Sequence, residues 1–287
     1  MKKVVVTGTA GRLGPHVAKH FVEKGYDVLS VDAKMPAELV ADHRTADFTN
    51  LGECYGILQG ADALIHLAAI PNALSYTSEV TFRNNVMSSY NLLEAADTLG
   101  IKKAVMASSE SSYGIVFSKK GIGPQYVPMD EDHPCLPEDS YALGKIVEEE
   151  ISRSIARRNG MQIINLRIGN VITPEMYAEK FPSFINDPTQ RSVILWSYID
   201  ARDIAVACEL AIEKDGLGVQ VMNIAADDNC TTFTSAELMK RGFPNVTDFR
   251  GPIDGQQTLL SNEKIKKVLG WKPQHSWRDY VPGHGKG

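Results

Sequence analysis

The amino-acid sequence predicts an α/β protein built on a doubly wound parallel sheet, with a small C-terminal lobe. Apolar runs typical of buried parallel strands alternate with helical segments through the first 170 residues. The first of these strands leads directly into a glycine-rich turn and a helix. The chain has 287 residues, 43% hydrophobic and 23% charged, which suffices for one large α/β unit carrying a smaller lobe.

The first strand, turn and helix have the features of an anion-binding site. Residues 4–6 are three valines that predict a buried strand, and Gly8, Gly11 and Gly14 then lead into a helix expected to run through Phe21. Glycines allow a positive φ and a close approach of backbone to a phosphate, while a helix N-terminus favours negative charge. The Gly-x-x-Gly-x-x-Gly spacing differs from the commoner Gly-x-Gly-x-x-Gly, and on its own it also fits an ordinary strand–helix turn.

A carboxylate after the second strand extends this unit to a predicted dinucleotide site. Gly25 ends the first helix, and residues 28–31 form the next strand. Asp32 follows, 18 residues after Gly14, where it can accept hydrogen bonds from the ribose hydroxyls of an adenosine. Asp32 could instead cap the next turn, but the complete strand–helix–strand unit favours a Rossmann-type dinucleotide site.

Composition excludes several classes of function. The net charge of −5 offers no basic surface for nucleic acid or an anionic membrane, and no apolar run reaches transmembrane length. Met1 leads into a strand without a signal-peptide region, and the four cysteines lack paired spacing, so we expect reduced thiols in a cytoplasmic protein. His16 and His20 share a helix face without a third ligand nearby, so no metal site is expected.

The following segments continue the alternation of strands and helices. Asp47 ends a short strand, where an adenine ring could lie, and it could equally cap the helix that follows. Small residues at the end of the strand 63–69 leave room for a cofactor, and His66 is expected in the core. The expected elements are a strand over 41–48, a helix over Leu51–Leu58, strands over 63–69 and 104–107, and a long helix over Asn85–Leu99.

Side chains suited to catalysis follow the strand 104–107. The serine-rich stretch 108–114 lies at the carboxyl edge of the sheet, where open α/β folds bind ligands. After a loop comes a helix expected over 140–157, on which Tyr141 and Lys145 share a face. The ammonium would favour the phenolate and lower the tyrosine pKa from about 10. Tyr-x-x-x-Lys alone is common on helix surfaces, but here it accompanies a glycine turn, a ribose-binding carboxylate and a serine run, which favours catalysis.

These motifs together resemble the extended short-chain dehydrogenase/reductases, which form the NAD-dependent epimerase/dehydratase family. The resemblance covers nearly the whole chain. It is carried by Thr7-Gly8-x-x-Gly11-x-x-Gly14, Asp32, Asp47, residues 66–69, Asn85-Val86, Ser108-Ser109, Tyr113-Gly114, Tyr141-x-x-x-Lys145, Leu166-Arg167-x-x-Asn170-Val171, residues 198–205 and residues 269–273.

The resemblance implies a role for each matching residue. Tyr141 would be the acid/base, Lys145 its activator and the ribose anchor, and Ser109 the group that polarises the substrate. The residues implied to hold NAD are Gly8, Gly11, Arg12, Leu13, Gly14, Asp32, Asp47, Phe48, Leu67, Ala68, Ala69, Asn85, Ala107, Tyr141, Lys145 and Ile168. Those expected at the substrate are Pro71, through nearby main-chain groups, with Ser109, Ser111 and Asn170.

The segment between Asn170 and Tyr198 narrows the substrate. It is short and has no glycine-rich, arginine-flanked stretch suited to a nucleotide diphosphate. The chain is in this respect similar to the compact uronate and aldose dehydrogenases, which oxidise the anomeric carbon of a free sugar to a lactone. Glu110 would repel a sugar carboxylate unless it points away, which leaves a neutral sugar or another polyol acid open.

The sequence therefore predicts an NAD-dependent dehydrogenase that transfers hydride between a small sugar, sugar acid or related polyol and the nicotinamide. Asp32 favours NAD because it would repel the 2′-phosphate of NADP, although Arg12 and Lys34 lie nearby. One alternative is a sugar or nucleotide-sugar epimerase or dehydratase that keeps its NAD bound. Another is a dinucleotide sensor without catalysis, which the intact set of Ser109, Tyr141 and Lys145 disfavours.

The expected organisation is one structural unit made of two parts. Residues 1–170 would form the dinucleotide-binding core, and residues 171–287 would form the substrate lobe and complete the core. The resemblance also implies a homodimer, in which the helices over 85–99 and 140–157 pair across a two-fold axis.

Overall fold

The computed structural model describes residues 2–284, and its centre is a seven-stranded sheet with the order β3-β2-β1-β4-β5-β6-β9. Every pairing in this sheet is parallel, which confirms the predicted doubly wound fold. The strands are β1 (Lys3–Thr7), β2 (Asp27–Asp32), β3 (Asp42–Thr45), β4 (Ala63–His66), β5 (Lys103–Ser109), β6 (Gln162–Ile168) and β9 (Val219–Ile224), with a separate pair, β7 (Val171–Ile172) and β8 (Ile199–Asp200).

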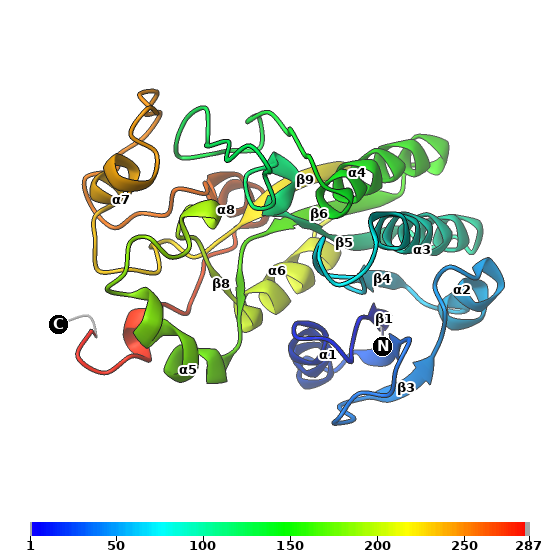
Figure 1. The fold of residues 1–287 in the computed structure, drawn as a ribbon. Coiled ribbons are helices and arrows are strands. Elements are labelled where there is room, and N and C mark those ends of the chain that lie inside the picture. Colours follow the sequence, from blue (N-terminus) through cyan, green and yellow to red (C-terminus); the bar gives the residue numbers. More distant parts are fainter. Residues whose placement is uncertain (1, 285–287) are drawn as a thin grey trace.

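The helices cover the sheet in two layers, seen on either side of it in Figure 1. Val4 and Val6 pack with the layer of α1 (Gly14–Glu23), α6 (Ala201–Glu213) and α8 (Glu263–Leu269). Val5 points to the other face and packs with α2 (Leu51–Leu58), α3 (Ser78–Thr98) and α4 (Ser140–Asn159). The consecutive valines are therefore buried on both faces, as an interior parallel strand requires.

The register brings the carboxyl ends of the central strands to one edge. Thr7 lies opposite both Val31 and His66, and Ser109 lies opposite Ile168. Because these strands end at the same level, the segments that follow them meet there. The glycine turn, Asp32, the loop after β4 and the serine stretch after β5 all lie at this edge, where doubly wound folds bind their ligands.

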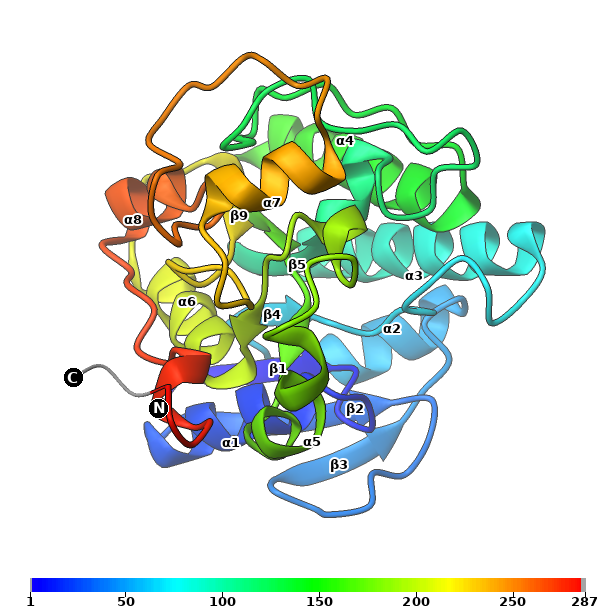
Figure 2. The ribbon, with the colours of Figure 1, turned by 60° about the vertical axis from the view of Figure 1, so that its left-hand side comes forward.

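The lobe is built from three stretches that are far apart in the sequence (Figure 2). Its apolar core draws on residues 113–129, 172–198 and 225–281. The lobe contains α5 (Pro174–Phe184), α7 (Ser235–Gly242) and the short 3-10 turns η2 (Ser192–Ile194) and η3 (Trp277–Asp279), with η1 (Glu110–Tyr113) at its border with the sheet. The C-terminal half thus divides between the lobe and the sheet, because α6 and β9 return to the core.

Two predicted elements differ in length from those observed. The helix expected from Asn85 begins at Ser78, because Thr81 is fully buried and Phe82 packs near Gly144 of α4, although this first stretch is rich in poor helix formers. The strand expected over 63–69 ends at His66, where Leu67 and Ala68 turn to donate to the Thr7 side chain. Across residues 2–284, no helix is both long and apolar enough to cross a membrane.

Candidate active site

The glycine turn forms a cradle that only glycine fits. Gly8 has φ +81°, and a Cβ there would lie 2.7 Å from the Ala68 nitrogen. A Cβ at Gly14 would lie 2.1 Å from the Gly8 carbonyl oxygen. No side chain caps the start of α1, whose N-cap is Leu13. Pro15 has no N–H and the His16 N–H donates to the Leu13 carbonyl at 3.1 Å, so within the first turn the Gly14 N–H is the group left for an anion. This arrangement fits the diphosphate of a dinucleotide, with Arg12 exposed beside it.

Asp32 is positioned by the backbone on both sides of the turn. Its Oδ2 accepts a hydrogen bond from the Ala10 N–H at 3.0 Å, and its Oδ1 accepts one from the Lys34 N–H at 3.2 Å. Each carboxylate oxygen can accept a further bond, as a ribose diol requires. No ion pair joins Asp32 to the side chains of Arg12 or Lys34 in the described chain, and both cations are exposed.

Asp47 does not cap the helix that follows it, so that alternative is wrong. Asn50 is the N-cap of α2 and accepts from the Gly52 N–H, whereas Asp47 accepts from the N–H and hydroxyl of Thr49 at 2.9 and 2.7 Å. Phe48 is buried beside this turn. The role of Asp47 and Phe48 at an adenine ring stays a prediction.

The loop after β4 is held by side chains beneath it. Thr7 Oγ1 accepts from the N–H groups of Leu67 and Ala68 and bonds His66 Nδ1 at 2.7 Å. Burial, with the nearby Lys145 ammonium, lowers the pKa of His66 to about 3, so this core histidine is neutral. The amide of Asn85 bonds the N–H and carbonyl of Ile70 at 2.8 and 3.0 Å. Asn85 therefore shapes the chain that runs past Ala69 to the exposed Pro71.

The three predicted catalytic side chains come together at the end of β5. Asp139 caps α4 by accepting from the Ala142 N–H at 2.8 Å, which sets Tyr141 in the first turn. Lys145 Nζ lies 5.7 Å from the centre of the Tyr141 ring and donates to the Ala107 carbonyl at 2.8 Å. Ser109 ends β5, and its Oγ accepts from the Ser111 N–H at 3.1 Å. All of these side chains are buried.

The Lys145 ammonium lowers the pKa of Tyr141 as expected, but the expectation that this pKa falls below about 10 is wrong for the chain by itself. Burial raises the pKa of the Tyr141 phenol, and the opposing effects of the Lys145 ammonium and a hydrogen bond with Ser109 do not cancel it. The carboxylates of Glu148 and Asp139 add to the rise. Glu148 Oε2 lies 2.9 Å from Lys145 Nζ, a neighbour that sequence spacing did not single out.

Two residues of the family motifs have a structural role here. Ser108 Oγ donates to Glu149 Oε1 at 2.7 Å, and Arg167 donates to both oxygens of the same carboxylate at 2.9 and 2.8 Å. The Arg167 guanidinium also packs on the Tyr113 ring, 4.9 Å from its centre. These buried contacts join β5, α4 and β6 and commit the Ser108 hydroxyl to Glu149, while Ser109 and Ser111 stay the residues predicted to contact the substrate.

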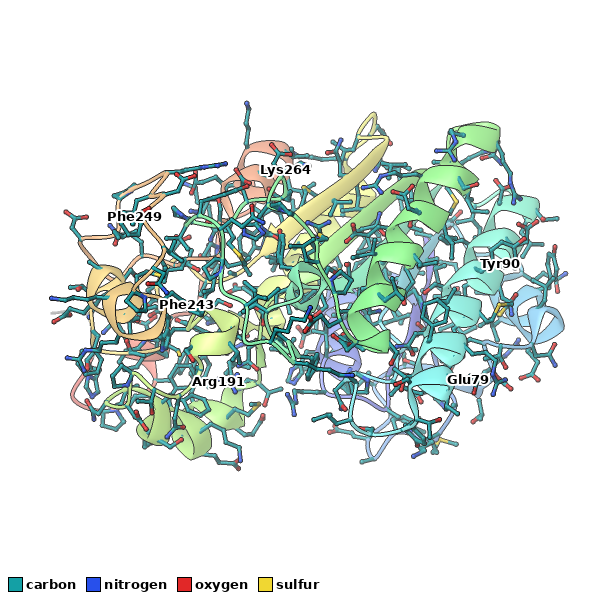
Figure 3. The ribbon with its side chains drawn as sticks, turned by 45° about the horizontal axis from the view of Figure 1, so that its top comes forward. Glu79, Tyr90, Arg191, Phe243, Phe249 and Lys264 are labelled. Carbon is teal, nitrogen blue, oxygen red and sulfur yellow. The ribbon has the colours of Figure 1, made fainter. Side chains whose placement is uncertain are left out.

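Sequence reasoning misjudged the charge of Glu110 and did not single out Arg191, whose charge acts on this carboxyl. Glu110 is buried and accepts from the Ser197 hydroxyl at 2.9 Å. Burial raises its pKa to about 8 despite that hydrogen bond and the charge of Arg191, so at neutral pH this carboxyl is largely protonated. The expected repulsion of a sugar carboxylate by Glu110 therefore does not apply. Arg191 lies in the segment between Asn170 and Tyr198, which has no glycine-rich, arginine-flanked stretch, and Figure 3 shows it in the lobe.

The remaining site residues line the border between sheet and lobe. Ile168 ends β6, and the Asn170 carbonyl accepts from the Ile199 N–H at 2.9 Å, which links this strand to β8. Their contacts with cofactor and substrate stay predictions. His20 bonds Glu209 at 2.7 Å, and within residues 2–284 no three His, Cys, Asp or Glu side chains are grouped to hold a metal ion.

The sequence and the structure both have known relatives. A putative UDP-glucose 4-epimerase of Methanocaldococcus jannaschii is 26% identical over 94% of this chain and 93% of its own length. A short-chain dehydrogenase/reductase superfamily protein from Agrobacterium tumefaciens with bound NAD superposes with a TM-score of 0.74, at 24% identity over 96% of this chain and 93% of its own. Uronate dehydrogenase from Agrobacterium tumefaciens has a TM-score of 0.68, at 21% identity over 96% of this chain and 85% of its own.

These matches define the family and leave the substrate open. Because this chain spans nearly the full length of an epimerase, its compactness does not separate free sugars from nucleotide sugars. The structural likenesses at this identity show the fold alone. The sequence pattern of the NAD dependent epimerase/dehydratase family matches residues 4–225, and the glycine cradle and Asp32 fit its cofactor. This chain is therefore an NAD-dependent enzyme of the epimerase/dehydratase family.

Proposed function

We propose that this protein is a dehydrogenase that oxidises a small free sugar or sugar acid with NAD. The observation that carries the proposal is a single lobe arginine, Arg191, whose charge acts on Glu110 in the Ser109–Ser111 turn. Between residues 185 and 284 there are five arginines, and Arg202, Arg250 and Arg278 are each paired with an aspartate. Arg241 lies on the ring of Phe233.

Arg191 likewise lies on a ring, that of Phe184, 5.0 Å from its centre, and no carboxylate is paired with it among the described residues. What distinguishes Arg191 is that its charge acts on Glu110 and that its buried Nε has no hydrogen-bond partner among the described residues. A nucleotide diphosphate carries two charged groups and would need more than one cation, whereas one guanidinium matches one carboxylate. The lobe therefore suits a monosaccharide or sugar acid better than a nucleotide sugar.

The proposed mechanism assigns one task to each buried side chain. Tyr141 would accept the proton of the substrate hydroxyl, Ser109 would hold that oxygen, and Lys145 would stabilise the phenolate and bind the ribose. The bound NAD supplies the hydride acceptor, and the positive charge of its oxidised ring would favour the phenolate that the chain alone disfavours. In the reverse direction, Tyr141 would return the proton.

The second candidate is an epimerase that acts on a nucleotide sugar and keeps its NAD bound. It is supported by relatives such as the putative UDP-glucose 4-epimerase of Methanocaldococcus jannaschii. The same three side chains would serve it, because hydride removal and hydride return use the same acid/base. A homodimer through α3 and α4 and a cytoplasmic location are compatible with both candidates and stay predictions.

The two candidates differ in whether reduced cofactor accumulates. We would mix the protein and NAD with a panel of free aldoses, uronates and hydroxy acids and follow the absorbance of the reduced nicotinamide. Net reduction with one or a few of them, and weak activity on their epimers, is expected, since each unmatched buried hydroxyl costs about 1–3 kcal/mol. Micromolar binding of a UDP-sugar in calorimetry, with no response to any free sugar, would instead support the epimerase.

A further inference from the structure

An ion pair lies inside the candidate active site, on the helix that carries Tyr141. Lys145 Nζ and Glu148 Oε2 are 2.9 Å apart, and each of the two residues is only 3% exposed. Burying two charges costs several kcal/mol per ion before their attraction is counted, and an apolar pair of similar size is often as stable. Stability alone therefore does not explain this carboxylate.

The hydrogen bonds of the ammonium show what the carboxylate does. A lysine ammonium has three N–H donors. One reaches the Ala107 carbonyl at 2.8 Å, and a second reaches Glu148 Oε2. A single donor is left for a ligand. The lysine is thus held on one side by a strand carbonyl and on the other by its own helix.

The second oxygen of the Glu148 carboxylate, Oε1, has few polar neighbours. Glu148 Oε1 is buried without a hydrogen-bond partner within residues 2–284, and so is the hydroxyl of Ser89 on α3. Glu148 Oε1 lies near Gly144, and the other side chains close to Gly144, those of Val86 and Phe82, are apolar. The carboxylate consequently has the Lys145 ammonium as its one close hydrogen-bonded cation.

We propose that Glu148 is a positioning residue of the active site: its carboxylate fixes the Lys145 ammonium, leaves one N–H for the ribose, and offsets the positive charge that reaches Tyr141. The proposal rests on the proposed function only for the role of Lys145 toward NAD and Tyr141. Without Glu148, the phenol would face a full positive charge and would ionise at lower pH. With Glu148, part of that positive charge is offset; burial raises the pKa of Glu148, and the Lys145 ammonium opposes that rise.

The other charges around the site do not replace this effect. On α4, Glu149 is taken up by Arg167 of β6, and Asp139 caps the first turn. His66 of β4 is neutral, since burial and Lys145 lower its pKa to about 3. Burial would lower the pKa of Lys145, but Glu148 and Tyr141 outweigh it and the pKa is raised.

The test follows the ionisation of Tyr141 in the protein without NAD. Tyrosines are labelled with carbon-13 at Cζ, and the resonance missing from Tyr141→Phe identifies residue 141. In wild type we expect its titration midpoint above the ordinary value of about 10. In Glu148→Gln we expect the midpoint to fall by about one pH unit or more. Glu150→Gln, which removes an exposed carboxylate paired with Arg153 on the same helix, should leave it unchanged.

Three results would overturn the proposal. These are a wild-type midpoint below about 10, an unchanged midpoint in folded Glu148→Gln, or an equal fall in Glu150→Gln. The wild-type measurement needs only Tyr141→Phe for its assignment, so a midpoint below about 10 overturns the proposal even if Glu148→Gln does not fold. Calorimetry of wild type with NAD is run alongside. Failure to bind NAD would count against the proposed function, while the titration still judges Glu148.

Discussion

Glu110 should make the stability of this protein fall as the pH rises. The carboxyl is buried next to Ser109, and burial raises its pKa from 4.5 to about 8. Below about pH 4.5 it is protonated in both the folded and the unfolded chain and has no effect. Between about pH 4.5 and 8 the unfolded chain ionises while the folded chain keeps its proton, so the free energy of unfolding falls by about 1.4 kcal/mol per pH unit.

The total loss follows from the size of the shift. The difference in the pKa of Glu110 between the folded and the unfolded chain corresponds to a loss of about 3 to 5 kcal/mol in the free energy of unfolding. This loss is complete slightly above pH 8. Glu110→Gln keeps the shape and can still accept from Ser197, but it does not ionise. The variant should therefore be more stable than wild type at pH 9 and similar to it at pH 5. Other titrating groups cancel in the difference between the two proteins.

Urea unfolding at several values between about pH 5 and 9 measures this difference. Glu79→Gln, which removes a carboxylate that is 68% exposed on α3, should parallel wild type at every pH. If the difference between wild type and Glu110→Gln were flat across the range, Glu110 would be ionised in the folded protein. The argument that the pocket tolerates a sugar carboxylate would then fail.

Three further outcomes test the cofactor, the acid/base and the assembly. Asp32→Ala should weaken NAD binding in calorimetry and reduce the preference for NAD over NADP. Equal use of both cofactors by wild type would mean that nearby cations outweigh Asp32. Tyr141→Phe should lower kcat by roughly 10²–10⁴-fold with little change in NAD affinity, and near-normal turnover would contradict the acid/base role of Tyr141. Lys145→Met should reduce both kcat and NAD affinity. Leu143→Glu, at a leucine 46% exposed on α4, should convert a dimer to monomers in sedimentation, and a persistent dimer would place the interface elsewhere.

Most of the sheet and the cofactor edge could be predicted because they depend on local sequence. The three valines of β1 and the glycine spacing after them are visible within a dozen residues, and the helix Leu51–Leu58 has the predicted bounds. Tyr141 and Lys145 are one helical turn apart, so their proximity follows from spacing alone. The structure brings them to Ser109 because α4 packs beside the end of β5, where Lys145 donates to the Ala107 carbonyl.

What the sequence could not reveal depends on distant partners. Glu110 looks like an ionised carboxylate until Ser197 and the lobe bury it. Arg191 could be singled out only in the structure, where its charge acts on Glu110 while Arg202, Arg250 and Arg278 are paired with aspartates. The pKa of Tyr141 was misjudged because the charge of Lys145 was considered without the burial of the phenol, which raises this pKa most, and without the carboxylate of Glu148, which adds to the rise.

The three-part construction of the lobe has a consequence for the order in which the chain folds. The Val127 N–H donates to the Asp248 carbonyl and the Met129 N–H to the Leu259 carbonyl, so these contacts close loops of more than a hundred residues. Such closures are slow and come after more local ones, whereas among β1 to β5 the most distant pairing, β1 with β4, joins residues about 60 positions apart, as Val4 with Ala63. We therefore expect a refolding chain to become competent for the dinucleotide before it can discriminate between sugars.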